Sequence, residues 1–415
     1  MERKKRILIL TVTAGNGHNA CAKAMQAELE AAGAEVRTVD FLKEWSDDLT
    51  VWTVDKGYNI AAAYFLYVYN ASFRRLKQRP PEKRYMLGLA QKISLSGAEG
   101  LLREVYSYRP DVIYCTHLYP AIAITDMRLL TAIPAKVYIT TFDYTLSPFW
   151  ESCIGVDYLN LPSEDFAEES RRLGYRDEQF LYCGIPVASK FLAPMDKAKA
   201  RTQLGMRAMF TVMVMFGGGQ WSGGQKIFKS VVRALEGVPA QIVMINGRNE
   251  REKRAIDREI AAGEYKDRPI VNVGFTDKVD VYMAASDVIV TKLGGTGASE
   301  CIDRLLPIVA AQRLLPQQEA ENADYLTQRG AALTYRTEKE LRAHLLHLMS
   351  DPEFYEGVRA AQAKLRKDGV TALAAHILSQ PYADYEHIAL PEREDFKREL
   401  SRLLKEADKA IRGKD

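Results

Sequence analysis

The stretch RILILTVTAGNGHNACA, residues 6–22, joins three features that together indicate a fold. Apolar residues run without interruption from Ile7 to Leu10, as in a strand that is buried on both faces. A glycine loop follows, and the segment after the loop has helical spacing. A strand that passes through a glycine loop into a helix is the opening unit of a Rossmann-like domain.

The glycine loop itself is open to two interpretations. Gly15, Gly17 and Ala20 fit the dinucleotide pattern G-x-G-x-x-G/A, and Asp40 follows about twenty residues later at the end of EVRTVD. His18 stands at the expected helix start, where backbone N–H groups are free to receive an anion or a substrate oxygen. The first pattern predicts NAD binding, whereas the second predicts a catalytic loop.

The same architecture begins again in the second half, where an apolar strand precedes the glycine loop FGGGQWSGG, residues 216–224. Short β-branched runs alternate with helical segments along the chain, which predicts parallel sheets with crossover helices. The predicted strands are RILIL, EVRTVD, DVIYCT, KVYITT, QFLYCG, FTVMVMF, QIVMIN, IVNVG, DVIVT and PIVAA. We therefore expect two Rossmann-like α/β domains that face each other across a cleft, with ligands beyond the carboxyl ends of the strands.

A break in periodicity separates the two halves at GIPVASKFLAP, residues 184–194, which contains two prolines and a glycine. The predicted organisation is a first domain over residues 1–185, a second over 186–370 and a helical tail over 371–415. The tail ends in EREDFKRELSRLLKEADKAIRG, whose alternating charges are typical of a solvated helix.

Composition excludes several classes of protein. With 415 residues, 47% hydrophobic and 27% charged, the chain has material for two packed cores and is not disordered. Its five cysteines show no C-x-x-C spacing, which predicts a reducing compartment and no zinc site. The apolar run of MERKKRILIL is too short for a secretory leader, and no segment reaches the ~20 apolar residues that span a bilayer.

A second glycine loop, KLGGTGASE, lies between the strand DVIVT and a helix. Gly294, Gly295 and Gly297 let the backbone approach a phosphate, and the helix start supplies partial positive charge. Glu300, one turn into the helix, is placed to accept hydrogen bonds from ribose hydroxyls. Neither glycine loop has the Lys-Ser/Thr pair of a P-loop, so nucleoside triphosphate hydrolysis is not expected.

The segment PQQEAENADYL follows the strand PIVAA. Gln318 and Glu319 would present an amide and a carboxylate to a polyol, as the ring hydroxyls of a sugar require. Taken alone, each could equally be an ordinary residue of a helical first turn.

Taken in order, these elements resemble the GT-B glycosyltransferases related to MurG and to the monogalactosyl- and glucosyl-diacylglycerol synthases. The resemblance covers residues 6 to 330 and rests on T-x-G-x-G-H at 13–18, FGGG at 216–219, NGRN at 246–249, GFT at 274–276, the Lys-x-Gly-Gly loop with Glu300, and Pro-x-Gln-Glu with Asn322. It implies that the C-terminal domain holds a UDP-sugar and the N-terminal domain an acceptor. It also implies inversion at the anomeric centre, with neither a metal nor a cofactor.

The resemblance assigns roles residue by residue. His18 would take the proton of the acceptor hydroxyl, a task that suits an imidazole with an ordinary pKa of ~6.5. The NAD interpretation of the first loop, in contrast, leaves the second glycine-rich half of the chain unexplained. The UDP-sugar-binding residues would be Gly17, Gly218, Gly219, Arg248, Phe275, Thr276, Lys292, Gly294, Gly295, Thr296, Glu300, Gln318, Glu319 and Asn322.

The chain also departs from the family pattern. Leu293 stands where proline or alanine is usual, Gly297 where threonine often contacts phosphate, and Gln317 where glycine is common. In TFDYTLSPFW, Phe142 precedes Asp143 and Ser147 replaces a histidine, which leaves the acceptor open. Asp143 either orients the acceptor or polarises His18, or it is a structural cap.

The segment from Trp45 to Tyr85 is rich in aromatic residues and ends in a basic cluster. Such a combination suits an anionic bilayer surface, although a core helix with a solvated turn would look similar. The predicted membrane residues are Trp52, Tyr64, Phe65, Arg74, Arg75, Lys77 and Arg79. No nucleic-acid-binding motif accompanies them.

We expect an inverting hexosyltransferase that uses a UDP-sugar and glycosylates diacylglycerol at the inner face of the cytoplasmic membrane. Three alternatives remain open at this point: a UDP-N-acetylglucosamine 2-epimerase, a MurG-like transferase with another lipid-linked acceptor, and a noncatalytic UDP-sugar sensor. The donated sugar, the number of sugars added and the oligomeric state do not follow from the sequence.

Overall fold

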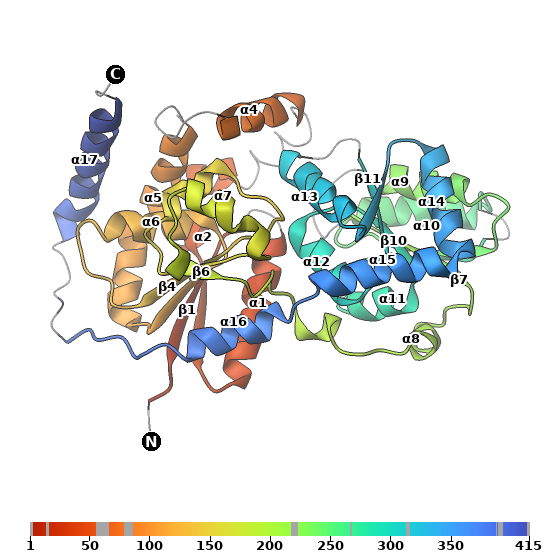
Figure 1. The fold of residues 1–415 in the computed structure, drawn as a ribbon, viewed down its shortest axis with the longest axis horizontal. Coiled ribbons are helices and arrows are strands. Elements are labelled where there is room, and N and C mark those ends of the chain that lie inside the picture. Colours follow the sequence, from red (N-terminus) through yellow and green to blue (C-terminus); the bar gives the residue numbers. More distant parts are fainter. Residues whose placement is uncertain are drawn as a thin grey trace. The chain divides into compact units, whose positions relative to one another are not determined.

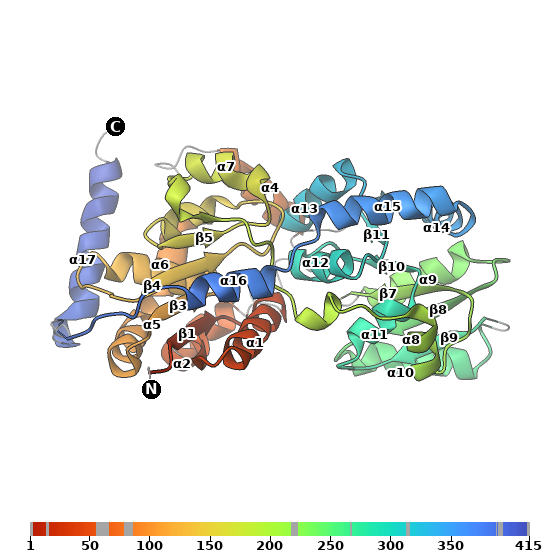
Figure 2. The same ribbon diagram turned by 60° about the horizontal axis from the view of Figure 1, so that its bottom comes forward.

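The computed structural model describes residues 3–13, 16–54, 66–78, 86–216, 223–265, 268–312, 316–386, 388 and 393–412. The chain divides into two compact units, and each contains one parallel sheet covered by helices (Figures 1 and 2). The first unit comprises Met1–Pro186 with Asp368–Asp415, and the second comprises Val187–Lys367. The segment expected as a helical tail thus clusters with the first unit.

The first sheet has six strands in the order β2-β1-β3-β4-β5-β6, and every neighbouring pair is parallel. Its strands are β1 (Arg6–Thr11), β2 (Glu35–Asp40), β3 (Val112–Cys115), β4 (Lys136–Thr140), β5 (Tyr158–Asn160) and β6 (Phe180–Leu181). Ile7 to Leu10 are fully buried, as the uninterrupted apolar run predicts, and each such side chain contributes ~1.5–3 kcal/mol of burial.

Helices cover this sheet on its faces. They are α1 (Asn16–Ala31), α2 (Phe41–Trp45), residues 48–54, α4 (Leu66–Gln78), α5 (Met86–Tyr108), α6 (Leu118–Met127), α7 (Ala167–Arg172), α16 (Gly369–Leu378) and α17 (Arg393–Arg412). Short 3-10 turns are η2 (Pro148–Cys153), η3 (Glu164–Phe166) and η4 (Asp177–Gln179).

The C-terminal segment is tied to this unit by specific contacts. Asp111, which is fully buried, accepts hydrogen bonds from the backbone N–H groups of Arg6 and Ala383, both at 2.9 Å. Helix α16 lies beside α1 in both views, and α17 packs on α5 and α6 with Leu400 fully buried (Figures 1 and 2). This burial accounts for the apolar positions within the otherwise charged α17.

The second sheet has six parallel strands in the order β12-β11-β10-β7-β8-β9. They are β7 (Phe210–Met215), β8 (Ala240–Ile245), β9 (Ile270–Val273), β10 (Val288–Thr291), β11 (Ile308–Ala311) and β12 (Ala332–Tyr335). The helices of this unit are α8 (Lys197–Gln203), α9 (Gly224–Ala234), α10 (Glu250–Ala261), α11 (Val279–Ala285), α12 (Gly295–Asp303), α13 (Gln317–Gln328), α14 (Glu338–Ser350) and α15 (Pro352–Leu365), with the 3-10 turn η5 (Ser189–Phe191).

The predicted fold class, two Rossmann-like domains with parallel sheets, is confirmed. All ten predicted strands are present, and the structure adds two strands that the sequence patterns missed, β5 and β12. Among the described helices, none combines the length and apolar character that crossing a membrane requires.

Candidate active site

In the first unit, Asp40 holds the loop that follows β1. Its Oδ2 atom accepts hydrogen bonds from the backbone N–H of Thr13 at 3.0 Å and from the Thr13 hydroxyl at 2.5 Å. Its Oδ1 atom caps α2 by accepting from the N–H of Lys43 at 3.2 Å. In a dinucleotide-binding domain the corresponding acid hydrogen-bonds the ribose. Here the carboxylate fixes the loop, which argues against the NAD interpretation.

His18 is the third residue of α1, and its Nδ1 atom hydrogen-bonds the backbone carbonyl of Thr116, the first residue after β3. Because a carbonyl oxygen only accepts, Nδ1 carries the proton and the basic lone pair lies on Nε2. No group in the described part of the chain hydrogen-bonds that Nε2 atom. The ring is thus oriented as a general base requires.

Desolvation lowers the pKa of His18 to about 4, against the opposing effect of the Thr116 carbonyl. Two aromatic rings cause part of this desolvation, and both contact the His18 ring edge-on. The centroid of the Phe142 ring lies 4.9 Å from the centroid of the His18 ring, and the centroid of the His117 ring lies 4.7 Å from it. His18 is therefore neutral at neutral pH and ready to accept a proton, although it is a weaker base than its ordinary pKa suggests.

Sequence patterns did not identify His117. It follows β3 and is the N-cap of α6, where its Nδ1 atom accepts a hydrogen bond from the N–H of Tyr119 at 3.2 Å. Burial lowers the pKa of His117 well below its usual range, and the neighbouring His18 lowers it further. The Thr116-His117 pair matches no motif, and only the pairing of β1 with β3 brings it beside His18.

Asp143 lies half-buried in the loop after β4. The Nδ1 atom of His18, which Asp143 could have polarised, is already paired with Thr116. A role for Asp143 in orienting the acceptor stays a prediction. Ser147, the residue that replaces the family histidine, caps η2 by accepting from the N–H of Phe149 at 3.2 Å.

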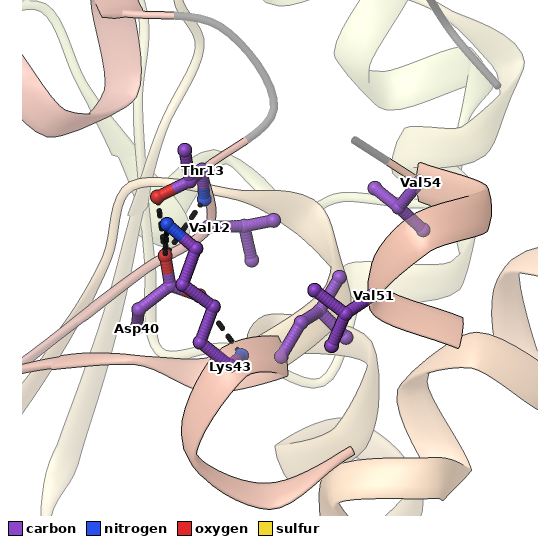
Figure 3. Close-up of a pocket in the computed structure, with 7 residues that line it drawn as sticks. Val12, Thr13, Asp40, Lys43, Val51 and Val54 are labelled. Carbon is purple, nitrogen blue, oxygen red and sulfur yellow. Dashed lines mark hydrogen bonds and ion pairs between the residues drawn. The ribbon is translucent and has the colours of Figure 1, made fainter. Parts of the chain in front are cut away.

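A pocket opens next to the loop after β1 (Figure 3). Its walls come from the ends of β1 and β2, from α2 and from the helical residues 48–54. Val51 and Val54 face it from one side, while Lys43 extends toward Asp40 on the other, with 3.9 Å between Nζ and Oδ2 (Figure 3). The pocket thus has an apolar wall and a charged rim.

In the second unit, the loop from Lys292 to Gly294 leads from β10 into α12. Gly294 is the N-cap of α12 and supplies no side-chain cap, so the first N–H groups of the helix are not satisfied by a capping side chain. A Cβ atom on Gly297 would meet open space. Gly294, Gly295 and Thr296 therefore form a helix start that suits an anion such as a phosphate.

Glu300 lies one turn further along α12 and is half-buried. Desolvation raises its pKa to about 7, and the charge of Lys190 opposes that shift. Among the described residues, no hydrogen-bond donor contacts its carboxylate. A desolvated carboxylate without a donor is suited to receive hydroxyl groups from a ligand.

Helix α13 holds the Lys292 loop from one side. Glu319 is 8% exposed and forms an ion pair with Lys292, with 2.6 Å between Oε1 and Nζ. Asn322 is fully buried and donates from Nδ2 to the Leu293 carbonyl at 2.8 Å. In this structure Asn322 therefore positions the loop. Direct contacts of Glu319, Asn322 and the half-buried Gln318 with a sugar stay predictions.

Three further predicted residues lie beyond the carboxyl ends of β8 and β9. Phe275 is 66% exposed, and the Arg248 guanidinium lies 5.1 Å from the centroid of its ring. This pair offers an aromatic surface with a neighbouring cation, as stacking of a base requires. Thr276 accepts from the N–H of Lys278 at 3.1 Å and so shapes the turn into α11.

The structure describes only some of the other predicted residues. Gly218 and Gly219 lie outside the described residues, as do Tyr64, Phe65 and Arg79 of the predicted membrane segment. Gly17 lies in the first turn of α1. In the described ranges, no three histidine, cysteine or acidic side chains are grouped to hold a metal ion.

The predicted membrane segment divides into exposed and engaged residues. Trp52 is 57% exposed, and Arg74 and Arg75 are exposed on α4. Lys77 forms an ion pair with Glu169, with 3.0 Å between the charged atoms, so its charge is partly engaged within the unit. Trp45, where the segment begins, packs against α5: a Cβ atom on Gly100 would lie 2.3 Å from its ring.

Models of known protein families match both units of the chain. The model of the monogalactosyldiacylglycerol (MGDG) synthase family matches residues 18–187, and that of the glycosyltransferase family 28 C-terminal domain matches residues 211–373. A probable chloroplastic monogalactosyldiacylglycerol synthase of Glycine max is 27% identical over 88% of this chain and 69% of its own length. The Arabidopsis thaliana synthase 1 is matched over 64% of its length. A processive diacylglycerol beta-glucosyltransferase of Bacillus cereus is 24% identical over 94% of this chain and 97% of its own length.

Solved structures share the fold at low identity. MurG of Acinetobacter baumannii superposes with a TM-score of 0.57 at 13% identity, over 90% of this chain and 99% of MurG. HepE of Anabaena, solved with UDP and glucose, has a TM-score of 0.54 at 14% identity, over 91% of this chain and all of HepE. These superpositions confirm the GT-B fold. The chain therefore belongs to the GT-B glycosyltransferases in which a monogalactosyldiacylglycerol synthase domain is followed by a family 28 C-terminal domain.

Proposed function

We propose that this protein transfers a hexose from a UDP-sugar to the free hydroxyl of 1,2-diacylglycerol, with inversion at the anomeric carbon. The observation that carries the proposal is the orientation of His18, whose Nδ1 proton is donated to the Thr116 carbonyl while Nε2 stays open. That geometry supplies a neutral base for one hydroxyl group. The names of the plant and Bacillus relatives support diacylglycerol as the molecule that carries this hydroxyl.

The donor would bind to the second unit. Phe275 and Arg248 would take the uracil, Glu300 the ribose, and the start of α12 the diphosphate. UDP and glucose in the HepE structure support this class of donor. The N–H groups of α12 and the charge of Lys292 would stabilise the departing UDP, so we propose a reaction without a metal or a cofactor.

In the reaction, Nε2 of His18 removes the proton of the lipid hydroxyl as its oxygen attacks the anomeric carbon. The bond between that carbon and the diphosphate oxygen breaks, and UDP leaves with the bonding electron pair. Attack from the side opposite the leaving group inverts the centre. A general base typically contributes ~10²- to 10⁴-fold to such a step.

We also propose peripheral binding to the inner face of the cell membrane. The exposed side chains of Leu49 and Trp52 on residues 48–54 and the exposed Arg74 and Arg75 support this location. Aromatic and aliphatic groups would enter the interfacial region, and each cation near an anionic surface would add ~1 kcal/mol.

The test is turnover with defined substrates. Purified protein would be incubated with labelled UDP-glucose, UDP-galactose or UDP-N-acetylglucosamine and with mixed micelles that contain diacylglycerol. We expect a glycosyl-diacylglycerol and free UDP, identified by mass spectrometry. An epimeric UDP-sugar formed without lipid would instead indicate an epimerase, and UDP-sugar binding without turnover would indicate a sensor.

A further inference from the structure

We propose that His117 binds the acceptor lipid by donating a hydrogen bond from Nε2 to an ester carbonyl next to the reacting hydroxyl. This inference rests on the proposed function, because it assumes a diacylglycerol acceptor. It assigns a role to a residue that no sequence pattern identified.

The two neighbouring histidines have opposite tautomers. His18 donates from Nδ1 to the Thr116 carbonyl, so its Nε2 carries a lone pair. His117 accepts at Nδ1 from the N–H of Tyr119, so a neutral His117 carries its proton on Nε2. The pair therefore offers one acceptor and one donor, with ring centroids 4.7 Å apart.

Neither open nitrogen has a hydrogen-bond partner among the residues that the structure describes. No group in the described part hydrogen-bonds the Nε2 atom of His18 or of His117, although both rings are only partly exposed. A partly desolvated donor without a partner is costly unless a ligand satisfies it. The Tyr119 ring also packs against His117, with 4.6 Å between the ring centroids, and limits the directions in which the His117 ring can turn.

Diacylglycerol has the complementary chemistry. It carries one hydroxyl group, which donates, and two ester carbonyls, which only accept. If the hydroxyl donates to His18, the ester on the adjacent glycerol carbon lies close to the histidine pair, and its carbonyl can accept the hydrogen bond that His117 donates. The histidine pair would thus recognise a hydroxyl with an ester beside it, rather than any primary alcohol.

The experiment uses two variants that separate the two nitrogens of His117. His117→Asn keeps an acceptor where Nδ1 caps α6 but loses the Nε2 donor, and asparagine is a good N-cap. His117→Gln keeps a donor near Nε2 but loses the cap. We expect His117→Asn to raise the KM for diacylglycerol about tenfold, as loss of one hydrogen bond predicts, with unchanged melting temperature and UDP affinity. His117→Gln should melt earlier yet keep a KM close to that of the wild type.

A lipid that lacks ester carbonyls serves as the matched control substrate. Dialkylglycerol has the same hydroxyl and chains, and at equal mole fraction in the same micelles the wild type should use it with about tenfold lower kcat/KM than diacylglycerol. In His117→Asn the two lipids should be equivalent. If the variant loses the same factor on both lipids, or if only His117→Gln is impaired, His117 is a helix cap alone and the inference is wrong.

A readout without turnover separates this inference from the proposed function. The chain has six histidines, so selective ¹⁵N-histidine labelling gives few signals, and His117→Asn identifies the one from His117. Dioctanoylglycerol should shift its Nε2 resonance, whereas dioctylglycerol should not. Equal shifts with both lipids, or none with either, overturn the carbonyl contact. Absence of any glycosylated lipid from the wild type would overturn the proposed function instead.

Discussion

Glu300 allows a quantitative prediction, because its carboxylate is desolvated and no described donor satisfies it. Desolvation holds its pKa at about 7 against the opposing charge of Lys190. Ribose hydroxyls donate hydrogen bonds to a carboxylate, so UDP should bind the ionised form and return the pKa toward its ordinary value. Binding of UDP should therefore be linked to the release of a proton.

The size of the effect follows from linkage. If the pKa falls from about 7 to its ordinary 4.5 when UDP binds, the affinity weakens ~30-fold between pH 8 and pH 5.5, which corresponds to ~2 kcal/mol. Near pH 7 about half a proton is released per UDP bound. Calorimetry in buffers of different ionisation enthalpy measures both quantities, and Glu300→Gln corrects for the titration of UDP itself.

A second measurement separates binding from stability. The folded-state pKa of Glu300 lies above its ordinary 4.5, so the ionised carboxylate destabilises the fold above pH 7, and this penalty disappears as the pH falls below 4.5. Glu300→Gln should therefore raise the free energy of unfolding at pH 8, by ~1–2 kcal/mol after allowance for its partial exposure, while it weakens UDP binding at least tenfold. An unchanged affinity for UDP, or a pH dependence shared by wild type and Glu300→Gln, would refute the ribose contact.

Three other predictions follow from the described contacts. His18→Asn keeps an amide donor for the Thr116 carbonyl but has no base, so it should bind UDP normally and lose ~10²-fold or more in turnover; near-normal rates would assign the base elsewhere. Glu319→Gln breaks the 2.6 Å ion pair with Lys292, so calorimetry should show weaker binding of UDP as well as of UDP-hexose. Weaker binding of UDP-hexose alone would mean that the loop does not depend on this ion pair. In vesicle sedimentation, the double variant Arg74→Ser, Arg75→Ser should reduce binding to anionic lipid in a salt-dependent way. Lys77→Ser should reduce this binding less, because Lys77 is already paired with Glu169. An equal or larger loss from Lys77→Ser would argue against a membrane-binding surface at Arg74 and Arg75.

The strands and glycine loops could be predicted because their signals are local. An apolar run such as Ile7 to Leu10 is buried wherever it lies, and a glycine before a helix indicates an uncapped helix start without reference to the rest of the chain. The contacts made by individual charged and polar side chains could not be predicted in this way. Lys77 looked like one more residue of a basic cluster, yet it pairs with Glu169, which is far away in sequence. Asn322 donates a hydrogen bond to the Leu293 carbonyl, a contact that its motif does not indicate.

The order of strands explains why His18 could be proposed from the sequence and His117 could not. In the first sheet, β1 lies between β2 and β3, so the chain direction across the sheet reverses at β1, and ligands of open parallel sheets bind at such a switch point. His18 follows β1 and His117 lies just beyond β3, so both stand at that point. In the second sheet the switch lies between β7 and β10, and the loop of Lys292 follows β10. A motif identifies one loop at a time, whereas the pairing of strands determines which loops share a site. The residues that motifs miss should therefore be sought on the strand next to each motif.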